Sequence, residues 1–550
     1  MRQRYFLFLA MVLSLHSGLA QQTSLQPRLI VGITVDQMRY DYLYKYYERY
    51  GTGGFRRMLS QGFSCENTHY DYAPTYTAPG HASIYTGTTP SVHGIIGNDW
   101  YDRATKRNRY VTADESVKGV GTERSSGQHS PAVLLASTIT DELRLSNAMQ
   151  SKVVGICIKD RGGILPAGHI PNACFWFDDA TGNWITSGYY PDSTELPKWV
   201  VKFNNKKLAL KYISEPWNTL EPEAAYVSKM PDWDKYEKRF PGDSTGAFPH
   251  VLPALVTKGG PGLVRSTPFG NTLTTDFALT AIEEMELGKD GYPDFLCLSY
   301  SSTDYVGHQF GVHSKEVEDT YLRLDRELSR LLDYLDEKFG KGNVLVFLTA
   351  DHGAGETVAH LKDIRIPTGI LEENKLVSSL NTHLQEVFGV RLPYVEAVVN
   401  QQVYVNEPVL PIAKLEVEQV RRAIADYLKK QDGVYGALTR EQLFAVAPEY
   451  PFIGLIRRGF HQRRSGDVVY MLDPSWLPEP FFAGGGTTHG SPYAYDTHVP
   501  LLWFGWKIPH GETHVPVAIS DIAPTLAALL HIMEPNGATG KPIAPLLEKR

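Results

Sequence analysis

The chain has 550 residues, of which 42% are hydrophobic and 21% charged, and its formal net charge is −7. This ordinary globular composition excludes a disordered or collagen-like chain. The acidic balance argues against a general nucleic-acid binder, so we expect no nucleic-acid partner. With only 4 Cys but 18 His, a Cys-rich zinc domain is excluded, and any metal would be held by His and carboxylates.

The first 20 residues have the pattern of a secretory signal peptide. A basic start precedes an apolar run over residues 5–15, and small residues lead up to Ala20. The run is too short to span a bilayer, and a buried core helix is the alternative. We expect cleavage near Ala20 and a periplasmic or secreted mature chain, residues 21–550, without a stable membrane anchor. Export permits disulfides, but the sequence leaves open three pairings or buried thiols for Cys65, Cys157, Cys174 and Cys297.

Short runs that are apolar at every position are predicted to be strands buried on both faces of a parallel sheet. These runs are residues 29–35, 153–158, 295–300, 344–349 and 499–504. An amphipathic helix is predicted between Ser314, its N-cap, and Gly340, and a second over residues 271–287. The alternation predicts an α/β fold, a three-layer sandwich with a mostly parallel central sheet. We expect the chain to act as a monomer.

Two stretches interrupt this alternation. Residues 163–270 are rich in Pro, Gly, Tyr and Trp, and residues 360–460 contain a predicted strand over 398–405 and a helix over 417–429. Neither stretch is bounded by a flexible linker. We therefore expect both to be insertions packed over the loop end of one catalytic domain.

Acidic and histidine side chains follow three of the predicted strands, and one histidine shortly precedes a fourth, at the edge where open parallel sheets bind ligands. They are Asp36, Asp304, His308, Asp351, His352 and His489. Each alone also fits a helix cap, a turn or a surface pair. Six such ligands at one sheet edge, without a Cys cluster, fit two adjacent metal ions, most naturally Zn²⁺.

Thr77 is the candidate nucleophile. Pro79 and Gly87 predict a short helix that has Thr77 at its N-terminal end. The positive end of a helix and a bound metal both favour the ionised hydroxyl. A helix cap without chemical function is the alternative, and the neighbouring metal ligands favour the nucleophile.

Together these motifs resemble the alkaline phosphatase superfamily, over residues 29 to about 545. The matching segments, in chain order, are Asp36, Thr77-Ala78-Pro79-Gly80-His81, Asp304 with His308, Asp351-His352-Gly353, and His489-Gly490. The resemblance implies one zinc held by Asp304, His308 and His489. It implies a second zinc surrounded by Asp36, Asp351, His352 and the Thr77 hydroxyl.

The triplet Lys159-Asp160-Arg161 points to one branch of this superfamily, although a solvated charge cluster is the alternative. It is similar to the Lys-x-Arg of periplasmic, phosphate-insensitive bacterial alkaline phosphatases that use a threonine nucleophile. The resemblance implies that Lys159, Arg161 and Asn98 bind the phosphoryl group. Two cations suit a doubly charged terminal phosphoryl group. The implied activity is zinc-dependent hydrolysis of small-molecule phosphate monoesters, with broad range, through a phospho-threonine that releases inorganic phosphate.

Two other functions compete with this one. A phosphodiesterase or nucleotide pyrophosphatase of the same fold would share the threonine, the asparagine and both zinc ions. A non-catalytic, zinc-containing binding protein would leave Thr77 as a helix cap. A sulfatase is disfavoured, because Thr77 and His81 stand where sulfatases carry Cys or Ser and Arg.

Overall fold

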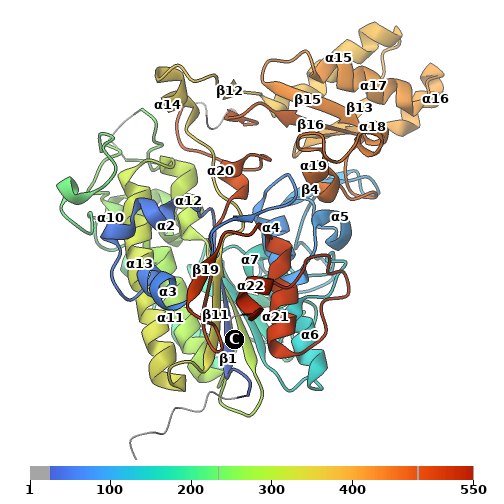
Figure 1. Ribbon diagram of the computed structural model, residues 1–550. Helices are drawn as coiled ribbons and strands as arrows, with labels where there is room; N and C mark the ends of the chain where they lie inside the picture. The colour runs from blue at the N-terminus through green and yellow to red at the C-terminus, as the bar shows by residue number, and fades with distance from the viewer. Residues whose placement is uncertain (1–24, 233–234, 244, 480–481, 483, 549–550) are drawn as a thin grey trace, which may run out of the picture.

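The computed structural model describes residues 25–232, 235–243, 245–479, 482 and 484–548 (Figure 1). The predicted signal peptide, residues 1–20, lies outside these residues. Within the described part of the chain, no helix is long and apolar enough to cross a bilayer. The four cysteines are buried free thiols.

One large sheet runs through the centre of the molecule (Figure 1). Over the described residues it has ten strands, in the spatial order β19, β2, β18, β11, β1, β10, β7, β8, β9, β6. In that order the strands span Gly511–Thr513, Phe63–Cys65, Leu501–Gly505, Val344–Thr349, Leu29–Val35, Asp294–Tyr300, Val153–Cys157, Ala173–Asp178, Asn183–Ser187 and Gly119–Val120. The five strands from β11 to β8 are parallel, whereas β18 and β9 run antiparallel to their neighbours. The predicted mostly parallel sheet is confirmed.

Helices cover both faces of this sheet, which confirms the three-layer sandwich (Figure 1). On one side lie α11 (Phe269–Glu284) and α13 (Lys315–Phe339), and on the other α4 (Thr77–Thr86), α7 (Arg161–Ala167) and α21 (Ile522–Leu530). Helix α13 begins as predicted, because the Ser314 side chain accepts a hydrogen bond from the backbone N–H of Val317. Gly340, with φ of 82°, follows its last residue.

The range expected as the first insertion contributes two strands to the central sheet, since β8 pairs with β7 and β9 pairs with β8. Beyond Ser187 this range forms short helices outside the sheet: α8 (Lys198–Asn204), α9 (Leu208–Tyr212) and α10 (Leu252–Gly259).

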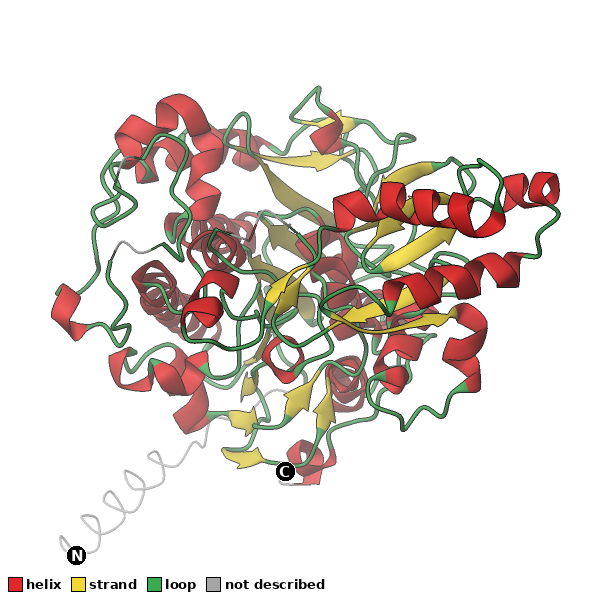
Figure 2. Cartoon of the chain, turned by 90° about the horizontal axis from the view of Figure 1, so that it is seen from above, coloured by secondary structure: helices red, strands yellow, loops and turns green. Residues whose placement is uncertain are grey.

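The second expected insertion carries a sheet and a core of its own, in the upper right of Figure 1 and at the right of Figure 2. The strands of this sheet, in spatial order, are β13 (Val395–Val399), β14 (Gln402–Val405), β16 (Val468–Leu472) and β15 (Val434–Thr439), and α15 (Glu373–Phe388) and α17 (Val417–Leu428) pack on them. β16 lies beyond residue 460, so the unit extends past the expected range. The prediction of one strand over 398–405 is wrong. Asn400 and Gln401 have positive φ, 54° and 60°, and form the two-residue turn of a hairpin.

Candidate metal and phosphate site

The carboxyl ends of three adjacent strands bring the predicted acidic ligands together. Asp36 directly follows β1, Asp351 lies just past β11, and Asp304 is in the first turn of α12 (Ser302–Phe310), which follows β10. One ligand atom each of Asp36, Asp351 and His352 lie within 4.8 Å of one another, and the same holds for Asp304, His352 and His489. The sheet topology thus creates two overlapping groups that could hold metal ions.

The three predicted histidine ligands share one orientation. The Nδ1 atoms of His308, His352 and His489 face backbone carbonyls of Thr487, Gly353 and Thr75, at 2.7, 2.9 and 2.7 Å. Because a carbonyl only accepts, each Nδ1 carries the proton and donates it. This leaves Nε2 of each ring as the nitrogen that could bind a metal, the arrangement typical of metal-ligating histidines.

His308 joins the second group through Asp304. Its Nε2 lies 3.1 Å from Oδ1 of Asp304, one helical turn earlier, and Nε2 of His489 lies 3.7 Å from the same oxygen. The rings of His352 and His489 stack, with centroids 3.3 Å apart and planes 11° apart. The imidazoles and carboxylates predicted from the sequence therefore converge on one region.

The electrostatics of this region fit dications. Oδ1 of Asp36 and Oδ2 of Asp351 are buried without a hydrogen bond. Burial and the Asp304 charge raise the pKa of Asp36 to about 6, and burial and Asp36 raise the pKa of Asp351 well above its usual range. Burial lowers the pKa of His489 to about 3, so this ring is neutral. Buried carboxylates of this kind are stable when paired or coordinated to metal.

Thr77 lies at the start of α4, next to the two groups of side chains that could hold metal ions. It is the first residue of α4, 1% exposed, and its Oγ1 is 3.4 Å from Nε2 of His352. The backbone N–H of Ala78 donates to Oδ1 of Asn98 over 2.9 Å, which leaves the Asn98 Nδ2 as a donor beside Thr77. Gly80 allows α4 to lie close to Asp351, because a Cβ there would clash with the backbone carbonyl of Asp351.

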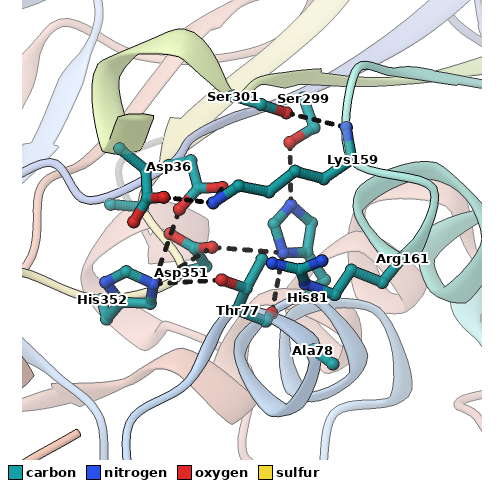
Figure 3. Close-up of polar contacts among 12 residues, drawn as sticks. Asp36, Thr77, Ala78, His81, Lys159, Arg161, Ser299, Ser301, Asp351 and His352 are labelled. Atoms are coloured by element: carbon teal, nitrogen blue, oxygen red, sulfur yellow. Dashed lines mark hydrogen bonds and ion pairs between the residues drawn. The ribbon is translucent and has the colours of Figure 1, made fainter. Parts of the chain in front are cut away.

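Lys159, in the loop after β7, and Arg161, the first residue of α7, reach into the site (Figure 3). The buried Lys159 Nζ lies 2.7 Å from Oδ2 of Asp36 and also pairs with Asp304. Although burial opposes ionisation, His308 and Lys159 hold the pKa of Asp304 well below its usual range. All predicted site residues thus lie in one region, and the side chains of Lys159 and Arg161 lie on the same side of it as Thr77 and Asp36.

Comparison with known proteins identifies the family. The sequence profile described as type I phosphodiesterase / nucleotide pyrophosphatase matches residues 30–490. The chain belongs to this family. The alkaline phosphatase PafA of Elizabethkingia meningoseptica is 46% identical over 531 residues, 96% of each chain. The alkaline phosphatase PhoV of Synechococcus elongatus is 45% identical over 527 residues, 96% of this chain and 94% of PhoV.

Solved structures agree with this assignment. A crystal structure of wild-type PafA has a TM-score of 0.91 and 45% identity, over 96% of this chain and 100% of that chain. A murine ectonucleotide pyrophosphatase/phosphodiesterase 5, at 13% identity and a TM-score of 0.55, shares the fold alone. The predictions of the alkaline phosphatase superfamily and of an enzyme of this kind are confirmed.

Three residues contact the predicted site residues but were given no role in the site from the sequence. Gln37, with φ of 63°, donates its backbone N–H to Asp351 and its Nε2 to Asp304, over 3.1 and 2.8 Å. His81 donates from Nδ1 to the Thr77 carbonyl at 2.9 Å, and its Nε2 lies 3.0 Å from the Ser299 hydroxyl. Adjacency to Asp36 and helical spacing from Thr77 were the available sequence signals for these two.

Tyr110 is the third such residue, and no sequence signal indicates it. It lies on β5 (Arg107–Tyr110), whose hairpin with β4 (Asp99–Asp102) places it against Asp160 and Arg161. Its hydroxyl accepts from Nη1 of Arg161 over 2.9 Å and donates to Asp160 over 2.9 Å. The Arg161 Nε is buried without a hydrogen bond. Tyr110 thus anchors one edge of the guanidinium.

Proposed function

We propose that this protein is an exported, zinc-dependent phosphomonoesterase that uses Thr77 as its nucleophile and accepts a broad range of small phosphate monoesters. The observation that carries the proposal is the position of the Thr77 hydroxyl. It lies at the start of α4, against His352 and the buried carboxylates, on the side to which Lys159 and Arg161 reach. The names of the relatives, alkaline phosphatases PafA and PhoV, support hydrolysis of phosphate esters.

Two Zn²⁺ ions suit the donor set. One would be held by Asp304, His308 and His489, and the other by Asp36, Asp351, His352 and the Thr77 hydroxyl. When bound, they would supply Lewis acidity that favours ionised hydroxyl groups and would neutralise developing negative charge. The six predicted side chains offer oxygen and imidazole nitrogen atoms only, which is a borderline donor set that zinc accepts.

The chain's own residues then carry out a double displacement. The Thr77 oxygen attacks phosphorus and forms a phospho-threonine, while the bond from phosphorus to the ester oxygen breaks and the alcohol leaves. Water hydrolyses the phospho-threonine, which returns the Thr77 hydroxyl and releases inorganic phosphate. Lys159, Arg161 and Asn98 bind the non-bridging oxygens, over which the negative charge of the transition state is spread.

A solved variant of PafA supports these roles. In that variant one threonine, one asparagine, one lysine and one arginine are substituted. They are the residue types, in the same order, of Thr77, Asn98, Lys159 and Arg161. The competing function, diester or pyrophosphate hydrolysis, is favoured by the description of the matched family. Two cations at the phosphoryl group, Lys159 and Arg161, suit a monoester better than a diester, which has one anionic oxygen fewer.

Removal of metal is the direct test of the cofactor. Chelation is expected to abolish hydrolysis of p-nitrophenyl phosphate, and addition of Zn²⁺ to restore it. Chelation should also lower the thermal midpoint of unfolding, because the buried charges of Asp36, Asp304 and Asp351 lose their counter-ions. A metal at a thousandfold excess over its Kd stabilises the folded state by about 4 kcal/mol. Zinc content, rate and thermal midpoint are measured together, and full activity of the metal-free protein would contradict the proposal.

Substitution of Tyr110 tests how Arg161 is positioned. Tyr110→Phe removes the hydroxyl that bridges Arg161 and Asp160, so kcat/KM for a monoester is expected to fall about tenfold. In an Arg161→Ala background the same change should have little effect, because the group that Tyr110 positions is absent. Tyr101→Phe is the matched control, since that hydroxyl lies on the same hairpin and donates to Glu396 instead. Equal losses in both backgrounds would show that Tyr110 acts on folding rather than on Arg161.

A further inference from the structure

A cavity of about 720 Å³ opens beside the predicted site. It shares Asn98, His308 and His489 with that site. His308 is the most exposed of the predicted ligand histidines, with 28% of its side chain accessible. The rest of the wall includes aromatic and cationic side chains for which the mechanism above gives no role.

The wall next to His308 combines an aromatic ring and an ammonium group. The Phe482 ring stacks with the His308 imidazole, with centroids 5.6 Å apart and planes 28° apart. The Lys238 Nζ lies 4.1 Å from the centroid of Phe482. Arg239 lines the same cavity, and Glu479 is the one carboxylate beside it among the described lining residues. This wall therefore has a net positive charge next to an aromatic ring.

A second part of the cavity wall is also aromatic and cationic. Tyr305 follows the predicted ligand Asp304, and the cations of Lys159 and Arg265 each lie 5.0 Å from the centroid of its ring. Cations over aromatic rings of this kind give a surface that attracts both ring systems and anions. The cavity is thus not a simple apolar pocket.

The cationic wall belongs to the stretch between β9 and α11 that lies outside the central sheet. The backbone N–H of Lys238 donates to the Gln309 carbonyl over 2.9 Å, at the end of α12. The backbone N–H of Gly486 donates to the Tyr236 carbonyl over 2.7 Å. These bonds attach the segment to α12 and to the loop that carries His489, so its position is tied to that of the site.

We propose that this cavity is the subsite for the leaving group, and that within the accepted range it favours monoesters whose leaving group is aromatic and carries a negative charge. The inference rests on the proposed function. In an in-line displacement the leaving oxygen departs on the side of phosphorus away from the nucleophile. Thr77 lies against His352, and the cavity opens beyond it at His308 and His489. The leaving group would therefore lie between the Phe482 and Tyr305 walls, with its anion beside Lys238 and Arg239.

Three substrates separate the two parts of the proposal: cyclohexyl phosphate, phenyl phosphate and 4-carboxyphenyl phosphate. Phe482→Leu is expected to lower kcat/KM about tenfold for both aryl esters and less than about twofold for the cyclohexyl ester. The double variant Lys238→Ala with Arg239→Ala should lower kcat/KM about tenfold for the carboxyphenyl ester and less than about threefold for phenyl phosphate. Each value is compared with the native protein on the same substrate, so intrinsic reactivity cancels.

Assays are run at pH 7, because burial lowers the pKa of Lys238 to about 8 and the ammonium must be charged. Inhibition constants of phenylphosphonate and cyclohexylphosphonate give a second measurement that does not depend on the rate of the chemical step. Their ratio should change in Phe482→Leu by the same factor as the ratio of kcat/KM.

Matched controls lie away from the cavity. Lys206→Ala removes an ammonium that lies 5.3 Å from the centroid of Phe203, outside the central sheet like Lys238, and Phe444→Leu removes a half-exposed ring. Both are expected to leave all three substrates unchanged. Equal losses on all three substrates in Phe482→Leu, with an unchanged phosphonate ratio, would overturn the leaving-group subsite. A native protein that hydrolyses none of the three would instead refute the proposed function itself.

Discussion

Thr77→Ala is expected to lower the rate of p-nitrophenyl phosphate hydrolysis by at least about a thousandfold, since removal of a catalytic nucleophile has effects of this size or larger. Alanine has no oxygen to attack phosphorus, so the phospho-threonine cannot form. The native protein, quenched with acid during turnover, should show one phosphoryl group on the peptide that contains Thr77. Thr77→Ala should show none by the same mass measurement.

Thr77→Ser is the matched control for this prediction. It keeps a hydroxyl at the first position of α4 and should retain activity and the phosphorylated peptide. Zinc content and thermal midpoint are measured for both variants, because Thr77 is also a predicted metal ligand next to His352. A Thr77→Ala protein with full activity and native zinc content would show that water, rather than Thr77, attacks phosphorus.

The ligand side chains could be predicted because strand ends are encoded locally. β1 is a mostly apolar run that ends at Val35, all of it buried, so Asp36 had to lie at the edge of the sheet. The same reasoning placed Asp304 and Asp351 beside Asp36, since all three follow parallel strands. Local signals also defined α4 and α13, whose ends are marked by Gly87 and by Ser314 with Gly340.

Features that depend on the packing of distant segments could not be predicted. The hairpin of β13 and β14 was missed because Asn400-Gln401 lacks the glycine that usually marks such turns. Tyr110 meets Arg161 only because the β4–β5 hairpin folds across α7, 51 residues away along the chain. The cavity wall at Lys238 likewise depends on hydrogen bonds between a loop and α12. Composition and periodicity contain no information about these contacts.

The double variant Lys159→Ala with Arg161→Ala removes both cations from the proposed phosphoryl position. Hydrolysis of p-nitrophenyl phosphate is expected to fall by at least about a thousandfold, because two charged donors to the transferring oxygens are lost. Hydrolysis of bis-p-nitrophenyl phosphate should fall less than about tenfold. A diester has one anionic oxygen fewer and a second substituent, so it gains less from two cations. Both substrates have the same leaving group, so the comparison isolates the charge.

Two measurements keep this test specific. Lys159 neutralises Asp36 and Asp304 in the structure, so zinc content must be compared to separate loss of metal from loss of substrate binding. Lys152→Ala is the matched control, since Lys152 immediately precedes β7, at the end away from Lys159, and donates to backbone carbonyls of Met285 and Glu286. It should leave both rates unchanged. Equal losses on monoester and diester at native zinc content would contradict the monoesterase assignment, because the two cations would then serve any phosphoryl group. A selective loss on the monoester would mean that Lys159 and Arg161 direct the proposed Thr77 and metal site to monoesters.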